Sequence, residues 1–144
     1  MISRAEILEL VPHAGAMCLI DRALSWDENE IHCASDSHRD PGNPLRRGGA
    51  LAAVHLIEYA AQAAALHAAL ASTSPTATRP GVLASVRDCE LDIERLDELP
   101  QTLQIHARRE ASSADALSYL FEVSHQARRL GRGRLMIRLG LAQT

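Results

Sequence analysis

The chain has 144 residues, of which 47% are hydrophobic and 23% charged, so it can bury the core of one domain. All 15 basic residues are arginine, and without lysine neither Schiff-base catalysis nor a lysine-dependent phosphate loop is possible. The net charge of −3 argues against a dedicated nucleic-acid-binding protein. We therefore expect a single domain over residues 1–144 with no nucleic-acid partner.

The cysteines and the apolar segments indicate in which cellular compartment the protein is expected. Cys18, Cys33 and Cys89 are odd in number and widely spaced, which argues against a disulfide framework or a zinc knuckle. The first ten residues lack the apolar core of a signal peptide. The longest nearly apolar run, Leu51–Leu70, is interrupted by polar side chains and is rich in weakly hydrophobic alanine. These features predict a cytoplasmic protein with reduced thiols and no membrane span.

The N-terminal third predicts a short helix followed by a hairpin. Ser3-Arg4-Ala5-Glu6 has the form of a capping box and should begin a helix that runs to about Leu10. Two strands are expected at Met17–Leu24 and Glu30–Ala34. The polar tripeptide Asp27-Glu28-Asn29 between them suits the tip of a hairpin.

The middle of the chain predicts one long helix. Asp36–Gly49 is punctuated by Pro and Gly and reads as a loop, and Ser72–Pro80 reads as a linker. Between them, Ala50–Ala71 holds 11 of the 24 alanines and predicts a helix. A helix that is small and apolar nearly all round is normally buried, and a sheet can curl closely around it.

The last third predicts an antiparallel meander. Its expected strands are Gly81–Cys89, Leu99–Arg109, Ala116–Gln126 and Arg134–Leu141. The expected fold is therefore α+β, with one long helix set against an antiparallel sheet of five or six strands.

Polar side chains gather on one side of the expected helix. At about 100° per residue, His55, Glu58, Tyr59 and Gln62 share a side, and Glu58 is the only formal charge in Ala50–Ala71. One interpretation is a solvated helix face. The other is a pocket with one carboxylate inside an apolar element, where desolvation raises the pKa of a carboxyl and suits it to acid–base work.

Further candidates lie in the loops. Gly48 and Gly49 precede the expected helix, whose first N–H groups can polarise a carbonyl oxygen. His38 and His13 stand beside Pro in loops. His55 and Glu58 are three residues apart without a second His-x-x-x-His, so we expect no metal site. The other histidines are interpreted as packing or surface residues, namely His32, His67, His106 and His125.

Arginines cluster near the C-terminus. The cluster consists of Arg128, Arg129, Arg132, Arg134 and Arg138. It is interpreted first as a solvated strand edge, where charge discourages pairing with other chains. The alternative is a docking patch for an acidic carrier protein.

Three segments resemble the β-hydroxyacyl-acyl-carrier-protein dehydratases of the hot-dog fold. Residues 10–22, L-V-P-H-A-G-A-M-C-L-I-D-R, resemble the family opening L-L-P-H-x-x-P-x-L-L-x-D-R-V. His38–Pro44 resembles a stretched G-H-F-P-G-x-P loop, and Glu58–Gln62 resembles the helix motif E-A-x-A-Q. The pattern is most similar to dehydratase-like proteins of aryl-polyene biosynthesis clusters. The span from His38 to Glu58 is six residues longer than in the dehydratase motif, which leaves both His38 and His55 as candidates for the base.

The resemblance implies removal of water from a 3-hydroxyacyl thioester on an acyl carrier protein, giving the trans-2-enoyl thioester, without a cofactor. It implies His38 or His55 as base and Glu58 as acid. It implies Gln62, His13 and the Gly48–Gly49 pair around the substrate. It also implies a homodimer, or a heterodimer with another hot-dog subunit, whose pockets lie at the interface. Three alternatives stay open: an acyl-thioester hydrolase, a non-catalytic partner subunit, and an acyl-CoA-binding protein without turnover.

Overall fold

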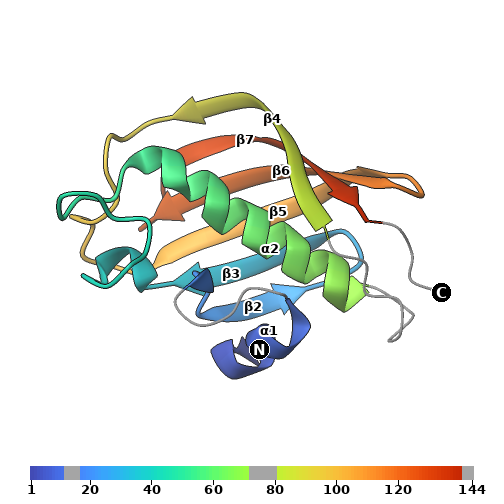
Figure 1. The fold of residues 1–144 in the computed structure, drawn as a ribbon, viewed down its shortest axis with the longest axis horizontal. Helices are drawn as coiled ribbons and strands as arrows, with labels where there is room; N and C mark the ends of the chain where they lie inside the picture. Colours follow the sequence, from blue (N-terminus) through green and yellow to red (C-terminus); the bar gives the residue numbers. More distant parts are fainter. Residues whose placement is uncertain (12–16, 72–80, 141–144) are drawn as a thin grey trace.

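The computed structural model describes residues 1–11, 17–71 and 81–140. One long helix lies across a single antiparallel sheet of seven strands, in the order β1-β2-β3-β5-β6-β7-β4 (Figure 1). This confirms the α+β class, although the sheet has more strands than the expected five or six. The strands are β1 (Ile2–Ser3), β2 (Arg22–Trp26), β3 (Glu30–Ser35), β4 (Gly81–Leu91), β5 (Leu103–Ser112), β6 (Ala116–His125) and β7 (Arg128–Leu139). The helices are α1 (Arg4–Leu10), η2 (Ser37–Arg39), η3 (Ala53–His55) and α2 (Leu56–Ala71).

The N-terminal helix begins and ends as its sequence predicts. Ser3 Oγ accepts the N–H of Glu6 at 3.4 Å, and the Glu6 carboxylate accepts the N–H of Ser3 at 3.3 Å. These two reciprocal bonds satisfy N–H groups that the first helical turn leaves unpaired. Ile7 is the buried residue of α1, and the helix ends at Leu10.

The first hairpin has its tip where the polar residues predict it. The Asp27 carboxylate accepts the N–H of Asn29 at 2.7 Å and that of Glu30 at 2.9 Å, which closes the turn between β2 and β3. The expected strand from Met17 is shorter, because β2 begins only at Arg22. The described residues just before β2 are held to α2 by the side chain of Gln62.

The second half forms the expected meander, with β5, β6 and β7 paired in succession. β7 begins at Arg128, six residues earlier than predicted, and it lies between β6 and β4. The interpretation of its arginines as a strand edge is therefore wrong. Arg129, Arg132 and Arg134 instead form ion pairs with acidic side chains on other strands of the same sheet.

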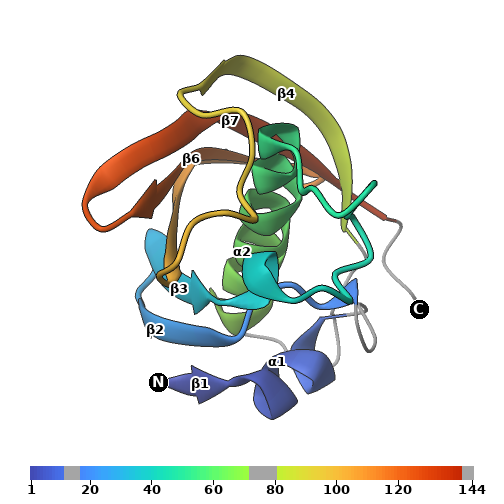
Figure 2. The ribbon, with the colours of Figure 1, turned by 90° about the vertical axis from the view of Figure 1, so that its left-hand side faces the viewer.

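The helix α2 fills the concave side of the curved sheet (Figure 2). Its Ala60, Ala63 and Ala64 are fully buried, and their small side chains let the backbone lie close to the strands. The helix packs mainly on β3, β5 and β6. The long strand β4 lies at one edge of the sheet, and most of its residues are exposed.

The helix starts later than the alanines predict. Ala50 and Ala52 make isolated β-bridges to Arg47 and Arg95, and α2 begins at Leu56 after the short turn η3. The Leu51 N–H donates to the Asp97 carboxylate at 2.8 Å, and its carbonyl accepts the Leu96 N–H at 2.8 Å. These long-range bonds override the helix propensity of the alanines. The predicted helix over Ala50–Ala71 is therefore wrong in its first residues.

Some expectations fall outside the described residues, namely His13, the linker over residues 72–80 and the last residues after 140. Within the three described ranges, no helix combines the length and apolar character needed to cross a membrane.

Candidate active site

Glu58 is the one exposed residue of α2, all of whose residues are described. It lies in the first turn of the helix, and its neighbours Ile57 and Ala61 are half-buried. The expectation that this carboxylate is buried within the chain is therefore wrong. The sheet wraps the opposite side of α2 (Figure 2), so Glu58 points away from the described strands.

Gln62 joins the helix to the segment that precedes β2. Its side-chain oxygen accepts the N–H of Leu19 at 2.8 Å, and its side-chain N–H donates to the carbonyl of Met17 at 2.7 Å. Gln62 is 5% exposed, and its bond to Leu19 is buried while its bond to the more exposed Met17 is part-buried. These contacts hold residues 17–19 against α2 and engage both ends of the Gln62 amide, which the resemblance places around the substrate.

Tyr59 makes the second link, to the loop after β3. Its hydroxyl lies 2.8 Å from Ser37 Oγ and accepts the Asn43 side-chain N–H at 3.2 Å. Asn43 also donates to the Ser37 carbonyl at 2.9 Å. Burial raises the pKa of Tyr59, which keeps the phenol neutral in this network. The sequence placed Tyr59 on the polar side of the helix but gave no signal for Ser37 or Asn43.

His38 is buried in the short turn η2, with no exposed surface. Its Nε2 lies 3.0 Å from the carbonyl oxygen of Leu99. A carbonyl only accepts, so Nε2 carries the proton and Nδ1 keeps its lone pair. Nδ1 is buried and has no hydrogen-bond partner. Burial lowers the pKa of His38, so the imidazole is neutral at pH 7 with one acceptor nitrogen free.

The structure separates the other predicted site residues. His55 ends η3 and is half-buried, three residues before the exposed Glu58. Gly48 and Gly49 are exposed, with φ of 57° and 79°, and they form the tip of a turn closed by hydrogen bonds between Arg47 and Ala50. The expectation that these glycines directly precede the helix is wrong, because residues 50–52 and η3 lie between.

Two surface hollows are formed by the described residues. One of about 370 Å³ lies beside the Tyr59 network and is lined by Ser37, Asn43 and seven further residues. The other, of about 740 Å³, lies on the outer face of the sheet. Neither is lined by His38 or Glu58. Within one chain, His38 and Glu58 therefore line neither of these hollows.

A long, alanine-rich helix wrapped by one curved antiparallel sheet defines the chain as a hot-dog-fold protein. Residues 5–139 match the ApeP-like family, described as ApeP dehydratase. The chain belongs to this family, which confirms the resemblance seen in its sequence. A comparison with curated protein sequences gives no significant match.

Solved structures show the same fold. The dehydratase heterocomplex ApeI:P from Xenorhabdus doucetiae contains a similar chain, with a TM-score of 0.83 and 21% identity over 94% of this chain and 91% of that one. AziG from S. sahachiroi has a TM-score of 0.65 and 16% identity, over 92% and 99% of the two chains. A thioesterase from Haemophilus influenzae has a TM-score of 0.68 and 10% identity, over 97% and 92%.

Proposed function

We propose that this chain is a subunit of a hot-dog dehydratase that converts a 3-hydroxyacyl thioester on an acyl carrier protein to the trans-2-enoyl thioester. Family membership over residues 5–139 supports dehydration as the reaction class. The assignment of the site rests on the state of His38, whose unpartnered and neutral Nδ1 is the kind of group that accepts a proton. The carrier-protein thioester is the substrate that the sequence resemblance implies.

The reaction needs two proton transfers at neighbouring carbons. His38 Nδ1 takes the proton from the α-carbon, and the electron pair forms the double bond as the β-hydroxyl leaves. Glu58 gives its proton to that hydroxyl, which departs as water. The proton held by the imidazolium then returns to the carboxylate, which restores both groups.

We place the two groups at sites that a partner subunit completes. Glu58 stands on the side of α2 away from the described strands, while His38 lies buried in η2. A carboxyl donates a proton readily only where burial disfavours its charged form, and a partner covering this side of α2 supplies that burial. His55, half-buried three residues before Glu58, is the second candidate for the base.

The partner pairs with the free edge of the sheet. β4 has eleven residues and ends the sheet, with Val82 65% and Leu91 42% exposed. A long strand edge that exposes apolar side chains is normally covered in a stable protein. The partner is either a second copy or a subunit of the ApeI type, as in the heterocomplex from Xenorhabdus doucetiae.

A specific observation favours a second candidate function, a non-catalytic partner subunit. His38 has no exposed surface, so a substrate reaches Nδ1 only if the loop around η2 moves. In that case the catalytic groups belong to the partner, and this chain contributes the interface and part of the acyl pocket.

One experiment separates these functions. The chain is incubated with a 3-hydroxyacyl carrier-protein thioester, alone and with an ApeI-type subunit, and the acyl-carrier species are weighed by mass spectrometry. Loss of one water that requires His38 and Glu58 supports the proposal. Loss of water that survives both His38→Gln and Glu58→Gln supports the non-catalytic subunit. Release of free acid assigns the chain to the thioester hydrolases instead.

A further inference from the structure

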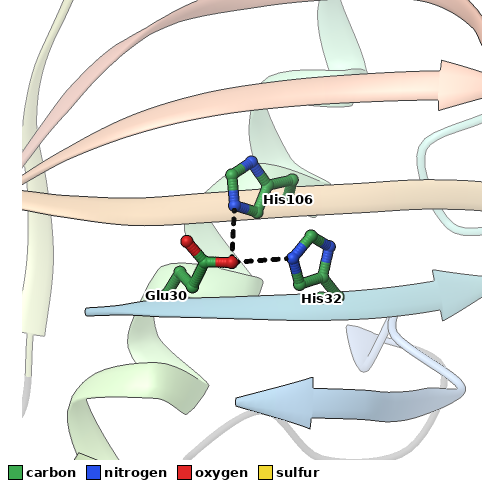
Figure 3. Close-up of side chains that lie close together, drawn as sticks. All are labelled: Glu30, His32 and His106. Carbon is green, nitrogen blue, oxygen red and sulfur yellow. Dashed lines mark hydrogen bonds and ion pairs between the residues drawn. The ribbon is translucent and has the colours of Figure 1, made fainter. Parts of the chain in front are cut away.

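Two histidines and a glutamate meet on the outer face of the sheet, away from α2 (Figure 3). Glu30 and His32 lie two residues apart in β3, so their side chains leave the same face of the strand. His106 in β5 is the direct register partner of His32. Ile31, between Glu30 and His32, and Ala107, next to His106, are fully buried on the opposite face of the sheet, which packs on the helix.

The strand register explains why the two imidazoles are so close. The Arg109 N–H donates to the Asn29 carbonyl, which sets the alternation of hydrogen-bonded pairs between β3 and β5. Counting along the ladder makes His32 and His106 a non-hydrogen-bonded pair, the type in which facing side chains approach most closely. Their ring centroids are 4.3 Å apart.

The ligand atoms all lie within 4.8 Å of one another, and the two carboxylate–imidazole distances are close to coordination spacing. Glu30 Oε1 is 3.0 Å from His32 Nε2 and 3.6 Å from His106 Nε2. Two ligands that bind one tetrahedral Zn²⁺ at about 2.1 Å are about 3.4 Å apart, so small side-chain shifts suffice. The rings are nearly parallel, at 17°, and one must turn about its Cβ–Cγ bond, which is a soft torsion for histidine.

The surroundings suit a bound cation. The three side chains are 35–45% exposed, so the cluster borders solvent. His106 Nε2 is buried and has no hydrogen-bond partner, which leaves a ring nitrogen available. Glu122 of β6 is the register partner of His106 on the other side and is also a neighbour with negative charge. The hollow of about 740 Å³ borders the cluster and leaves room for water or a further ligand.

We propose that Glu30, His32 and His106 bind one divalent transition-metal ion of the Zn²⁺ class. Two imidazoles and a carboxylate are a donor set that suits Zn²⁺ and related ions. The site ties β3 to β5 on the face opposite the helix, and it is separate from the groups assigned to thioester chemistry. The sequence interpretation of His32 and His106 as packing or surface residues did not anticipate this pairing, because strand register brings them together across 74 positions.

The test is titration of ZnCl₂ into the tag-free, EDTA-treated full chain, followed by calorimetry. We expect one ion per chain and binding at least about 10-fold weaker in His32→Gln and in His106→Gln, since even outer-shell changes cost about 10- to 100-fold. His55→Gln is the matched control, because His55 lies on the helix side, and it should bind as the wild type does.

A second measurement uses only the wild-type chain. The Co²⁺ form should show visible d–d absorption with one equivalent bound, and X-ray absorption should show two imidazole nitrogens in the coordination shell. An ion-pair cluster without a metal predicts no saturable binding at one equivalent. The proposal would be overturned by that result, by a coordination shell without two imidazoles, or by wild-type Zn²⁺ affinity in His32→Gln and His106→Gln.

Discussion

His38 donates its Nε2 proton to the carbonyl oxygen of Leu99 at 3.0 Å, and this one bond fixes the state of the whole imidazole. Because the carbonyl cannot donate, Nδ1 remains an unprotonated acceptor. It is buried without a partner, and the neutral ring is what a general base requires. The bond therefore connects the loop after β3 to the chemistry that we propose.

The first prediction concerns a variant that removes the proposed base and keeps its hydrogen bond to Leu99. In His38→Gln the amide N–H₂ can still donate to Leu99, but no group can take a proton at the position of Nδ1. Dehydration should fall by about 10²- to 10⁴-fold, the usual contribution of general acid–base catalysis. Circular dichroism and the Tm should stay close to wild type. Full activity in this variant would remove His38 from the mechanism and leave His55→Gln as the next test.

The second prediction concerns the acid. Glu58→Gln keeps the size of the side chain but cannot donate a proton, so dehydration by the assembled enzyme should also fall by about 10²- to 10⁴-fold. The matched control is Glu28→Gln, an exposed glutamate at the tip of the β2–β3 hairpin, which should keep wild-type turnover. Equal turnover in the two variants would contradict the assignment of Glu58.

The third prediction is a loss of stability in mild acid. Burial lowers the pKa of both His38 and His67 in the folded chain, so the unfolded chain binds more protons below about pH 6.5. The free energy of unfolding should therefore fall as the pH drops from 6.5 through the folded pKa values. Urea titrations across this range measure it, and His38→Gln should flatten the dependence. A stability that rises on acidification would show that these histidines are charged in the fold.

The fourth prediction tests the link between α2 and residues 17–19. Gln62→Leu leaves the buried Leu19 N–H without a partner, at a cost of about 1–3 kcal/mol, and removes the donor to the part-buried Met17 carbonyl. Gln62→Glu restores an acceptor for Leu19 but no donor for Met17, and should lie between. Urea unfolding of both variants checks the order. A neutral Gln62→Leu would mean that water replaces the amide.

The sequence predicted the elements whose signals are local. The Ser3–Glu6 capping box, the Asp27 turn and the β5–β6–β7 meander were all readable, because each depends on neighbours in the chain. The start of α2 was not, since Leu51 is held by Asp97 and Leu96, more than forty positions away. The candidate site likewise depends on contacts between residues far apart in the chain.

Residue types alone could identify Glu58 and Gln62 as candidates, but they could not predict that Glu58 is exposed and Gln62 buried. One faces solvent and the other faces the segment before β2, although they are one helical turn apart. The difference arises from which side the curved sheet wraps, and that depends on long-range strand pairing. Cross-strand register likewise decides that His32 meets His106, which no spacing within either strand indicates.

The fifth prediction concerns the open edge of the sheet. Val82→Arg places a charge on the exposed part of β4 and should weaken subunit association by at least about 10-fold, or about 1.4 kcal/mol. The matched control is Leu24→Arg on β2, which is 38% exposed, near the opposite edge. Light scattering of the chain alone and with an ApeI-type subunit measures the association. Equal weakening by both variants would place the interface elsewhere.

The most direct test of the central claim is the mass of a 3-hydroxyacyl carrier-protein thioester after incubation with the wild-type chain and an ApeI-type subunit. The account predicts loss of one water from the acyl group, abolished when His38→Gln and Glu58→Gln are combined in this chain. An unchanged acyl mass, or water loss that persists undiminished in the double variant, would contradict it.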